Sequence, residues 1–308
     1  MKKRDFLSLG DLSKSEILSL LALASRLKKN KVKRLSPLKG KSIGLLFQKP
    51  SNRTRVSFEV AVWQLGGWCL YLGPEEIDLG KRESGADVAR TLSRYLDTIV
   101  ARTHTHADLL ELARWASIPV INGLSDLSHP CQGLADLFSI KERFKSFQGL
   151  TLAYIGDGNN NVCHSLLLGA SQVGLNMKIA SPTGYEPRRD ILDQAQHFAK
   201  ESGVGILLGD SPWEAVKAAQ VIYSDVWVSM GQESEAEKRL RDFQRFQINA
   251  GLLEGADKDY IFMHCLPAHR GQEVTSEVID GPHSIVFDQA ENRLHVQKAV
   301  LMFLLVEK

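Results

Sequence analysis

Short apolar runs alternate with longer segments in which apolar residues recur every three or four positions, from about residue 42 to residue 264. Runs such as Ser42–Phe47 and Thr151–Ile155 are typical of buried strands. Segments such as residues 162–173 have the periodicity of helices. Because strand and helix alternate regularly, the sequence predicts an α/β fold with parallel sheets covered on both faces.

Two series of such elements follow one another, with a break expected near residues 147–149. The expected strands are 42–47, 70–72, 98–101, 119–122, 151–155, 177–180, 205–208, 221–224 and 261–264. The expected helices are 56–65, 87–95, 107–116, 131–144, 162–173, 189–200 and 212–219. We therefore predict two doubly wound domains, 1–147 and 148–290, with polar ligands at the carboxyl ends of the strands.

Composition narrows the class of ligand. The 308 residues are 44% hydrophobic and 24% charged, which is ordinary for a globular chain, and the net charge is only +2. That charge gives no general attraction to nucleic acid or to an anionic membrane, so an anionic ligand would need a local cluster of basic residues. No signal peptide or membrane span is expected. The four scattered cysteines predict free thiols and a cytoplasmic location.

The densest basic cluster runs from Lys49 to Arg55, between a predicted strand and a predicted helix. The start of a helix offers free backbone N–H groups and a positive dipole end, and both favour an anion. Ser51 and Thr54 add hydroxyl groups, while Arg53 and Arg55 add guanidinium groups suited to phosphate. One of the two arginines can instead be structural. A capped helix with solvated arginines is the alternative interpretation.

Polar residues follow other strands of the first series. Arg102 ends a strand, and His129 and Gln132 open a helix, where both can donate to a carbonyl group. An ordinary first helical turn beside Pro130 is the alternative for the latter pair.

The second series has three such loops. Residues 156–161 suggest a dinucleotide-binding turn, but Asn161 stands where the last glycine of that fingerprint belongs, so an amide-lined pocket for a polar substrate is favoured. Asp225 can hold an ammonium group or cap a helix. Cys265 beside His264 suggests a nucleophile, although a buried structural cysteine is the more common case.

Together, residues 47–59, 129–132, 225–231 and 263–267 resemble the ornithine carbamoyltransferase family in order and spacing. The first two segments resemble transcarbamoylases in general, and the last two resemble the branch that uses ornithine. The resemblance implies a C-terminal helix at about 291–306 that packs back on the N-terminal domain, so that residues 291–308 complete that domain. It also implies homotrimers, or multiples of them, with active sites at subunit contacts.

The implied reaction transfers the carbamoyl group of carbamoyl phosphate to the side-chain amine of L-ornithine, giving L-citrulline and phosphate without a metal or an organic cofactor. The resemblance assigns carbamoyl phosphate to Ser51, Asn52, Arg53, Thr54, Arg102, His129, Gln132, Cys265, Leu266 and Arg293. It assigns ornithine to Asn161, Asp225, Ser229 and Met230. The implied catalytic groups are Arg53, Arg102, His129, Asp225 and Cys265.

Two positions depart from the family pattern. Asn52 stands where many members have threonine, and Asp78 stands where many have glutamine, in a loop expected to reach a neighbouring active site. Lys81 or Arg82 is the expected basic contribution of that loop. Rival functions are a transcarbamoylase for putrescine, aspartate or an acylated ornithine, a dinucleotide-dependent dehydrogenase, and a catalytically silent regulatory subunit.

Overall fold

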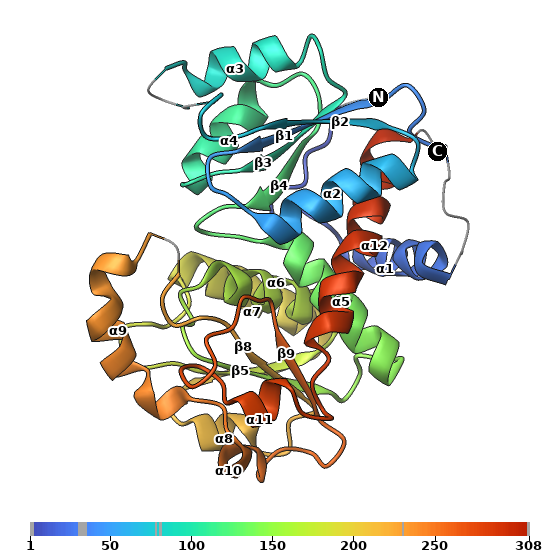
Figure 1. Ribbon diagram of the computed structural model, residues 1–308. Helices are drawn as coiled ribbons and strands as arrows, with labels where there is room; N and C mark the ends of the chain where they lie inside the picture. Colours follow the sequence, from blue (N-terminus) through green and yellow to red (C-terminus); the bar gives the residue numbers. More distant parts are fainter. Residues whose placement is uncertain (1–2, 30–35, 78, 80–81, 230, 307–308) are drawn as a thin grey trace. The chain divides into compact units, whose positions relative to one another are not determined.

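The computed structural model describes residues 3–29, 36–77, 79, 82–229 and 231–306. The chain divides into two compact units (Figure 1). Unit 1 comprises Met1–Phe138 with Glu291–Lys308, and unit 2 comprises Ser139–Ala290. Each unit contains a parallel sheet flanked by helices, so the predicted α/β class is confirmed.

The sheet of unit 1 has four parallel strands in the order β2-β1-β3-β4. These are β1 (Ser42–Phe47), β2 (Trp68–Leu72), β3 (Thr98–Arg102) and β4 (Val120–Leu124). The chain proceeds outward from β1 in one direction and from β3 in the other. The carboxyl ends of β1 and β3 are therefore the switch point at which such sheets bind ligands.

Helices cover both faces of this sheet. They are α1 (Lys14–Lys29), α2 (Asn52–Gln64), α3 (Gly85–Leu92), α4 (His106–Trp115), the first part of α5 (Pro130–Phe144) and most of α12 (Val286–Leu305), with a short 3-10 helix η1 (Leu9–Asp11). Val88 of α3 and Leu109 of α4 pack with Leu46 and Ile99 of the strands. Helices α2 and α12 lie on the other side of the sheet from α3 (Figure 1).

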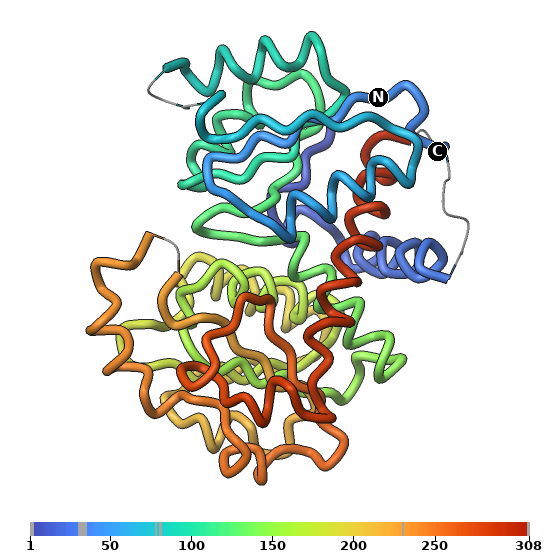
Figure 2. Tube along the Cα trace, in the orientation of Figure 1, coloured from blue at the N-terminus to red at the C-terminus, as the bar shows by residue number. Residues whose placement is uncertain are grey.

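The final helix joins elements from the other end of the chain. Lys28 Nζ of α1 donates to Asn292 Oδ1 (2.8 Å), and Lys298 Nζ donates to Gln64 Oε1 of α2 (2.9 Å). Figure 2 shows the trace of α12 running beside α1. The expected packing of the C-terminal helix on the N-terminal domain is confirmed, although α12 starts earlier than about residue 291.

Unit 2 has a sheet of five parallel strands in the order β7-β6-β5-β8-β9. The strands are β5 (Thr151–Ile155), β6 (Asn176–Ala180), β7 (Ile206–Gly209), β8 (Val221–Ser224) and β9 (Ile261–His264). The switch point lies between β5 and β8, so the loops after these two strands are the expected ligand loops of this unit.

The helices of unit 2 are also placed on both faces (Figure 1). They are α6 (Asn161–Val173), α7 (Arg189–Ser202), α8 (Pro212–Val216), α9 (Ala236–Asp242), α10 (Ala250–Leu253) and α11 (Ser276–Ile279), with 3-10 helices η2 (Glu233–Glu235) and η3 (Gln244–Phe246). Helices α6 and α7 pack together on one face. On the other face, Trp227, Phe243 and Phe262 belong to one buried cluster.

Several element boundaries differ from the sequence prediction for local reasons. Helix α2 begins at Asn52 rather than at residue 56, because the Ser51 hydroxyl accepts from Thr54 N (3.3 Å) and caps the helix. Helix α1 and the short helices after residue 231 were not predicted. Within the described ranges, no helix is both long and apolar enough to cross a bilayer.

The loop after β5 gives a test of the fold. A Cβ at Gly158 would lie 2.7 Å from Ser181 Oγ and 2.8 Å from the Tyr185 carbonyl oxygen, whereas a Cβ at Gly209 would have no atom within 4 Å. We expect Gly158→Ala to lower the free energy of unfolding by about 1–3 kcal/mol through overpacking. Gly209→Ala is the matched control and should change it little. Equal thermal unfolding midpoints for the two variants would contradict this account.

Candidate active site

The start of α2 presents an anion site. Ser51 is the N-cap residue, and Asn52 and Arg53 are exposed in the first turn, while Thr54 is buried. The backbone N–H groups of this turn and the helix dipole favour negative charge at the carboxyl end of β1. Both the cap and the basic residues predicted from the sequence are therefore present.

Arg55 has a different role from Arg53. Its Nε donates to Glu59 Oε1 (2.9 Å), and its guanidinium carbon lies 3.7 Å from the centre of the Tyr71 ring. These contacts hold Arg55 on the outside of α2. Of the two arginines in the motif, Arg55 is the structural one, and Arg53 is left as the candidate anion ligand.

Arg102 ends β3 with its side chain buried, and only 5% of the residue is exposed. Burial, together with the positive charges of Arg293 and Arg53, lowers the pKa of Arg102 to about 10. Its Nε has no hydrogen-bond partner among the described residues. A buried guanidinium with an unused N–H group is suited to an incoming anion or carbonyl oxygen.

His129 precedes α5 and is also buried. Burial lowers its pKa well below the ordinary value of 6.5, and the charges of Arg293, Arg102 and Arg53 lower it further. The imidazole is therefore neutral near pH 7, with one N–H donor and one acceptor nitrogen. A neutral histidine in a positive site can donate a hydrogen bond to a carbonyl oxygen without adding charge.

Arg293 brings the C-terminal helix to the same edge of the sheet. Its Nη1 donates to Gln132 Oε1 (2.7 Å), and its Nη2 donates to Thr54 Oγ1 (3.0 Å). Gln132 Nε2 in turn donates to Asp136 Oδ1 (2.8 Å). A buried network thus links α2, α5 and α12 at the ends of β1 and β3.

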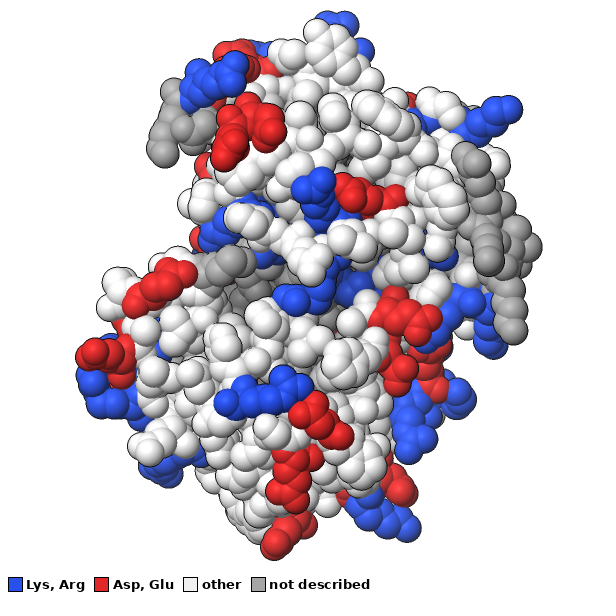
Figure 3. Space-filling view, viewed as in Figure 1, with Lys and Arg blue, Asp and Glu red and all other residues white. Residues whose placement is uncertain are grey.

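Positive charge is concentrated at one edge of the sheet of unit 1 and is not spread over the protein surface. On the face shown in Figure 3, Lys and Arg side chains alternate with Asp and Glu. At the sheet edge of unit 1, by contrast, Arg53, Arg102 and Arg293 are near enough to one another to lower the pKa of Arg102 and of His129. This edge can hold a small anion that carries a carbonyl group.

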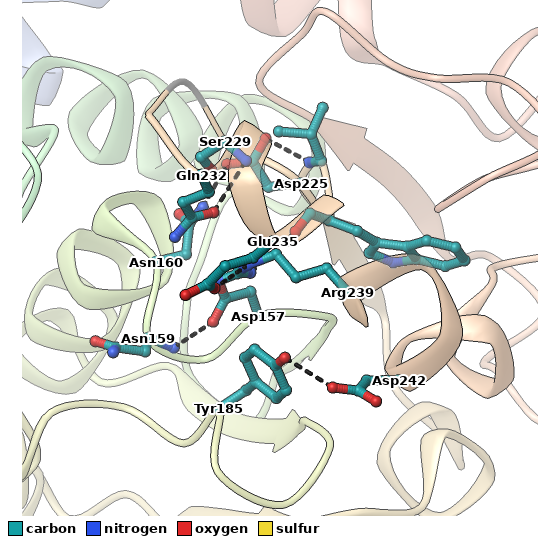
Figure 4. Close-up of polar contacts among 12 residues, drawn as sticks. Asp157, Asn159, Asn160, Tyr185, Asp225, Ser229, Gln232, Glu235, Arg239 and Asp242 are labelled. Carbon is teal, nitrogen blue, oxygen red and sulfur yellow. Dashed lines mark hydrogen bonds and ion pairs between the residues drawn. The ribbon is translucent and has the colours of Figure 1, made fainter. Parts of the chain in front are cut away.

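Unit 2 has a carboxylate surrounded by donors (Figure 4). Asp225 follows β8, and its Oδ2 accepts from Asn160 Nδ2 (2.9 Å). Its Oδ1 accepts from Val226 N (2.8 Å) and from Cys265 Sγ (2.9 Å). Asn160 also caps α6, because its Oδ1 accepts from Val162 N (2.7 Å). The loops after β5, β8 and β9 therefore meet at Asp225.

The loop after Asp225 is fixed by its own side chains and by α9. Ser229 N donates to Gln232 Oε1 (3.0 Å). Arg239 Nη1 donates to Asp157 Oδ2 (2.7 Å) and to the Trp227 carbonyl oxygen (3.0 Å), so that one buried guanidinium joins the loops after β5 and β8 (Figure 4).

Leu266 has a left-handed backbone, with φ at 56°. This conformation costs a leucine about 1–2 kcal/mol, and such strain is concentrated at functional sites. The Leu266 N–H is held by His264 Nδ1 (2.9 Å). The loop that begins at Cys265 is therefore kept in a specific conformation by the buried histidine before it.

Among the described residues, Asp225, His264 and Cys265 offer three metal-ligand atoms within 4.8 Å of one another. Nitrogen, sulfur and oxygen ligands of this kind suit zinc. However, His264 Nδ1 already accepts from Leu266 N, and the Cys265 thiol already donates to Asp225. A metal ion bound by the thiol would displace the hydrogen bond from Cys265 to Asp225, and we assign none here.

The structure thus groups the predicted site residues within each unit. In unit 1, Thr54, Gln132 and Arg293 form one network. In unit 2, Asp225 and Cys265 are hydrogen-bonded, whereas Asn161 and Ser229 are half-buried on the neighbouring loops. Met230, Asp78 and Lys81 lie outside the described residues.

Two polar neighbours of the site, Asp136 and Arg239, were not predicted from the sequence, and Asn160 was included only as part of the expected amide-lined loop 156–161, without a role of its own. Asn160 could have been found from its position just before a helix, where asparagine is a favoured cap. Asp136 could have been found from its position one helical turn after Gln132. Arg239 has no local signal, because its partner Asp157 is distant in sequence.

Comparison with known proteins identifies the class. Residues 4–142 match the family model of the aspartate/ornithine carbamoyltransferase carbamoyl-P binding domain. Residues 148–304 match that of the Asp/Orn binding domain. The chain belongs to the aspartate/ornithine carbamoyltransferase family, which confirms the resemblance found in the sequence.

Individual relatives match along almost the whole chain. The ornithine carbamoyltransferase of Anoxybacillus flavithermus is 52% identical over 307 residues, which cover 99% of this chain and 98% of that protein. The enzyme of that name from Thermococcus kodakarensis is 53% identical over 300 residues, covering 97% and 95%. The solved structure of the Pyrococcus furiosus ornithine carbamoyltransferase has a TM-score of 0.95 and 51% identity, and the match covers 98% of this chain and 97% of that one.

The low pKa of His129 leads us to predict how the free energy of unfolding depends on pH. Because the folded state binds this proton less readily than the unfolded state, His129 contributes stability above pH 6.5 that is lost as the pH falls below 6.5. The loss amounts to about 1.4 kcal/mol for each pH unit below that value. In His129→Asn, the free energy of unfolding should therefore fall less between pH 7 and pH 5.

The measurement is denaturant unfolding at a series of pH values in buffers without phosphate. His197→Asn, at an exposed histidine of α7, is the control for replacing an imidazole by an amide. If the free energy of unfolding changed with pH in the same way for the wild type and His129→Asn, the folded protein would not disfavour the protonated form of His129.

Proposed function

We propose that this protein transfers the carbamoyl group of carbamoyl phosphate to the side-chain amine of L-ornithine, giving L-citrulline and phosphate. The observation that carries the proposal is the match along almost the whole chain to proteins named ornithine carbamoyltransferase. The buried positive site of unit 1 and the Asp225–Cys265 pair of unit 2 supply groups of the right chemistry.

Unit 1 is proposed to bind carbamoyl phosphate. Ser51, Asn52, Arg53 and Thr54 hold the phosphate at the start of α2, where backbone N–H groups and the helix dipole add to the charge of Arg53. The backbone N–H of Asn52 serves here without a threonine hydroxyl. Arg53 also stabilises the negative charge of the departing phosphate.

The carbamoyl part is assigned to Arg102, His129, Gln132 and Arg293, with Cys265 and Leu266 near the reacting amine. Arg102, the neutral His129 and the Thr54 hydroxyl stabilise the oxyanion that forms when the carbonyl carbon is attacked. In other enzymes, one such donor contributes on the order of 3 kcal/mol to the transition state.

Ornithine is assigned to Asn161, Asp225, Ser229 and Met230 of unit 2. The side-chain amine starts protonated in solution, with a pKa of about 10 by analogy with lysine, and must lose a proton before it attacks. Asp225 and the Cys265 thiol that it accepts from are proposed to position the amine and to ease this proton loss.

In the reaction, the lone pair of the amine forms a C–N bond to the carbonyl carbon, and the carbonyl electrons move to its oxygen. When the carbonyl reforms, the C–O bond to phosphate breaks and phosphate leaves with the electron pair. The second amine proton is lost to phosphate or to water. This chemistry requires no redox partner, metal or organic cofactor.

Three further features belong to the proposal. The carbamoyl phosphate domain comprises residues 1–147 with 291–308, and the ornithine domain comprises residues 148–290. The protein acts in the cytoplasm, where its four free cysteines would remain reduced. It forms a homotrimer, or a multiple of one, with active sites at subunit contacts.

A panel of acceptors tests the reaction. With carbamoyl phosphate present, ornithine should give citrulline with a kcat/KM at least 100-fold higher than the values for putrescine and aspartate, because a site built for the α-amino and carboxylate groups discriminates strongly against analogues without them. Citrulline is measured colorimetrically, and phosphate release gives an independent rate. No citrulline from ornithine would overturn the proposal.

A thiol substitution tests the role of Cys265. Cys265→Ala removes the thiol that donates to Asp225, so kcat with ornithine should fall about tenfold and its pH profile should shift. Cys163→Ala, at a buried thiol of α6 in the same unit, is the control and should leave the pH profile unchanged. Unchanged turnover and pH profile in Cys265→Ala would show that Cys265 only lines the site and does not assist proton loss.

A further inference from the structure

The amide of Gln132 is held in one orientation by two buried charged groups. Gln132 Nε2 donates to Asp136 Oδ1 (2.8 Å), and Gln132 Oε1 accepts from Arg293 Nη1 (2.7 Å). Gln132 is 1% exposed, Asp136 is fully buried, and Arg293 is 4% exposed. Gln132 and Asp136 are four residues apart in α5, so they lie on one face of the helix.

Asp136 and Arg293, the two hydrogen-bond partners of Gln132, have opposite hydrogen-bonding capacities. A carboxylate only accepts hydrogen bonds, and a guanidinium group only donates them. If the Gln132 amide turned over, its oxygen would face Asp136 and its NH2 group would face Arg293. Both hydrogen bonds would be lost in a buried site, where unpaired polar groups are costly.

Arg293 extends the same constraint to Thr54. Its Nη2 donates to Thr54 Oγ1 (3.0 Å), so that the hydroxyl oxygen acts as an acceptor here. The hydroxyl proton of Thr54 is then directed to another acceptor. The network therefore offers an oxygen acceptor at Gln132 and a hydroxyl donor at Thr54.

We propose that Asp136 is a positioning residue that makes Gln132 present its oxygen, not its nitrogen, to the NH2 group of carbamoyl phosphate. The proposal rests on the proposed function. An amide oxygen has two lone pairs, so Gln132 Oε1 can accept from Arg293 and from the carbamoyl N–H together. Asp136 thereby makes the site distinguish a carbamoyl group from an acetyl group, which has nearly the same shape but a methyl in place of NH2.

Neither the length nor the polarity of the Gln132 side chain would give this selectivity alone. With a neutral neighbour at position 136, only the hydrogen bond from Arg293 would oppose the turned amide, in which an NH2 group faces the carbamoyl NH2 and offers no acceptor. Asp136 has at least one further polar interaction, so its loss can also affect stability. The test must therefore separate selectivity from folding.

The experiment compares the dissociation constants of carbamoyl phosphate, acetyl phosphate and inorganic phosphate by calorimetry. In Asp136→Asn, carbamoyl phosphate should bind about tenfold more weakly, while the other two ligands change less than about twofold. The preference for carbamoyl over acetyl phosphate should then nearly disappear. The KM for ornithine should be unaffected.

Asp136→Ser is measured beside it, because a serine hydroxyl can satisfy either end of the amide and so also removes the constraint that Asp136 imposes. The matched control is Asp97→Asn, a carboxylate in the same unit that accepts from Lys41 Nζ (2.9 Å) and Ser42 N (2.8 Å) before β3, away from the site. It should lower the melting temperature and leave the preference intact. In a Gln132→Ala background, Asp136→Asn should have no further effect on the preference.

The outcomes are distinguishable. Equal weakening of all three ligands in Asp136→Asn would show a merely structural role and overturn the inference. An unchanged preference in both Asp136 variants that fold would overturn it as well. If the wild-type protein itself bound no carbamoyl phosphate and made no citrulline, the proposed function would fail, and the inference with it.

Discussion

Repulsion among guanidinium groups at one sheet edge, where Arg102 and Arg293 are buried and Arg53 is exposed, governs the first unit. Arg53, Arg102 and Arg293 share the carboxyl edge of one sheet, and their charges and burial lower the pKa of Arg102 to about 10 and keep His129 neutral. Such an arrangement destabilises the unliganded fold, because charges of one sign are brought together away from water. It persists because Gln132 and Thr54 accept hydrogen bonds from Arg293 and because the helix packing of α12 holds that residue in place. A dianionic ligand would relieve the repulsion and stabilise the unit.

The second unit stabilises a buried negative charge instead of a group of positive charges. Asp225 is a buried carboxylate that accepts hydrogen bonds from an amide, a backbone N–H and a thiol, and within the described part of the chain these donors rather than an ion pair stabilise it. The Arg239–Asp157 ion pair holds the surrounding loops instead, and Leu266 takes a left-handed backbone supported by His264. The Arg239–Asp157 ion pair and the His264–Leu266 contact thus hold the loops around Asp225, while the Asp225 carboxylate remains available to a cationic substrate.

Sequence patterns were sufficient for most of the fold. β1, β5, β8 and β9 were predicted to the residue, because apolar runs bounded by turn residues are a strong signal for buried parallel strands. The N-terminal helix α1 was missed, although its apolar residues have helical spacing. The role of Arg239 could not be read locally, because its partner Asp157 lies 82 residues before it in sequence. Asp136 lies one helical turn after Gln132, but the Arg293 that holds the other end of the Gln132 amide is 161 residues beyond Gln132.

The discontinuity of unit 1 has a consequence for how the protein is made. Its sheet comes from residues 42–124, but Arg293 lies in α12, so the Thr54–Gln132 network cannot close until α12 has been synthesised. A chain that ends before α12 lacks Arg293, although it still contains Arg53 and Arg102 at the same sheet edge. Helix α12 therefore couples synthesis to function: a chain acquires the complete network at its anion site only when α2, α5 and α12 are all present.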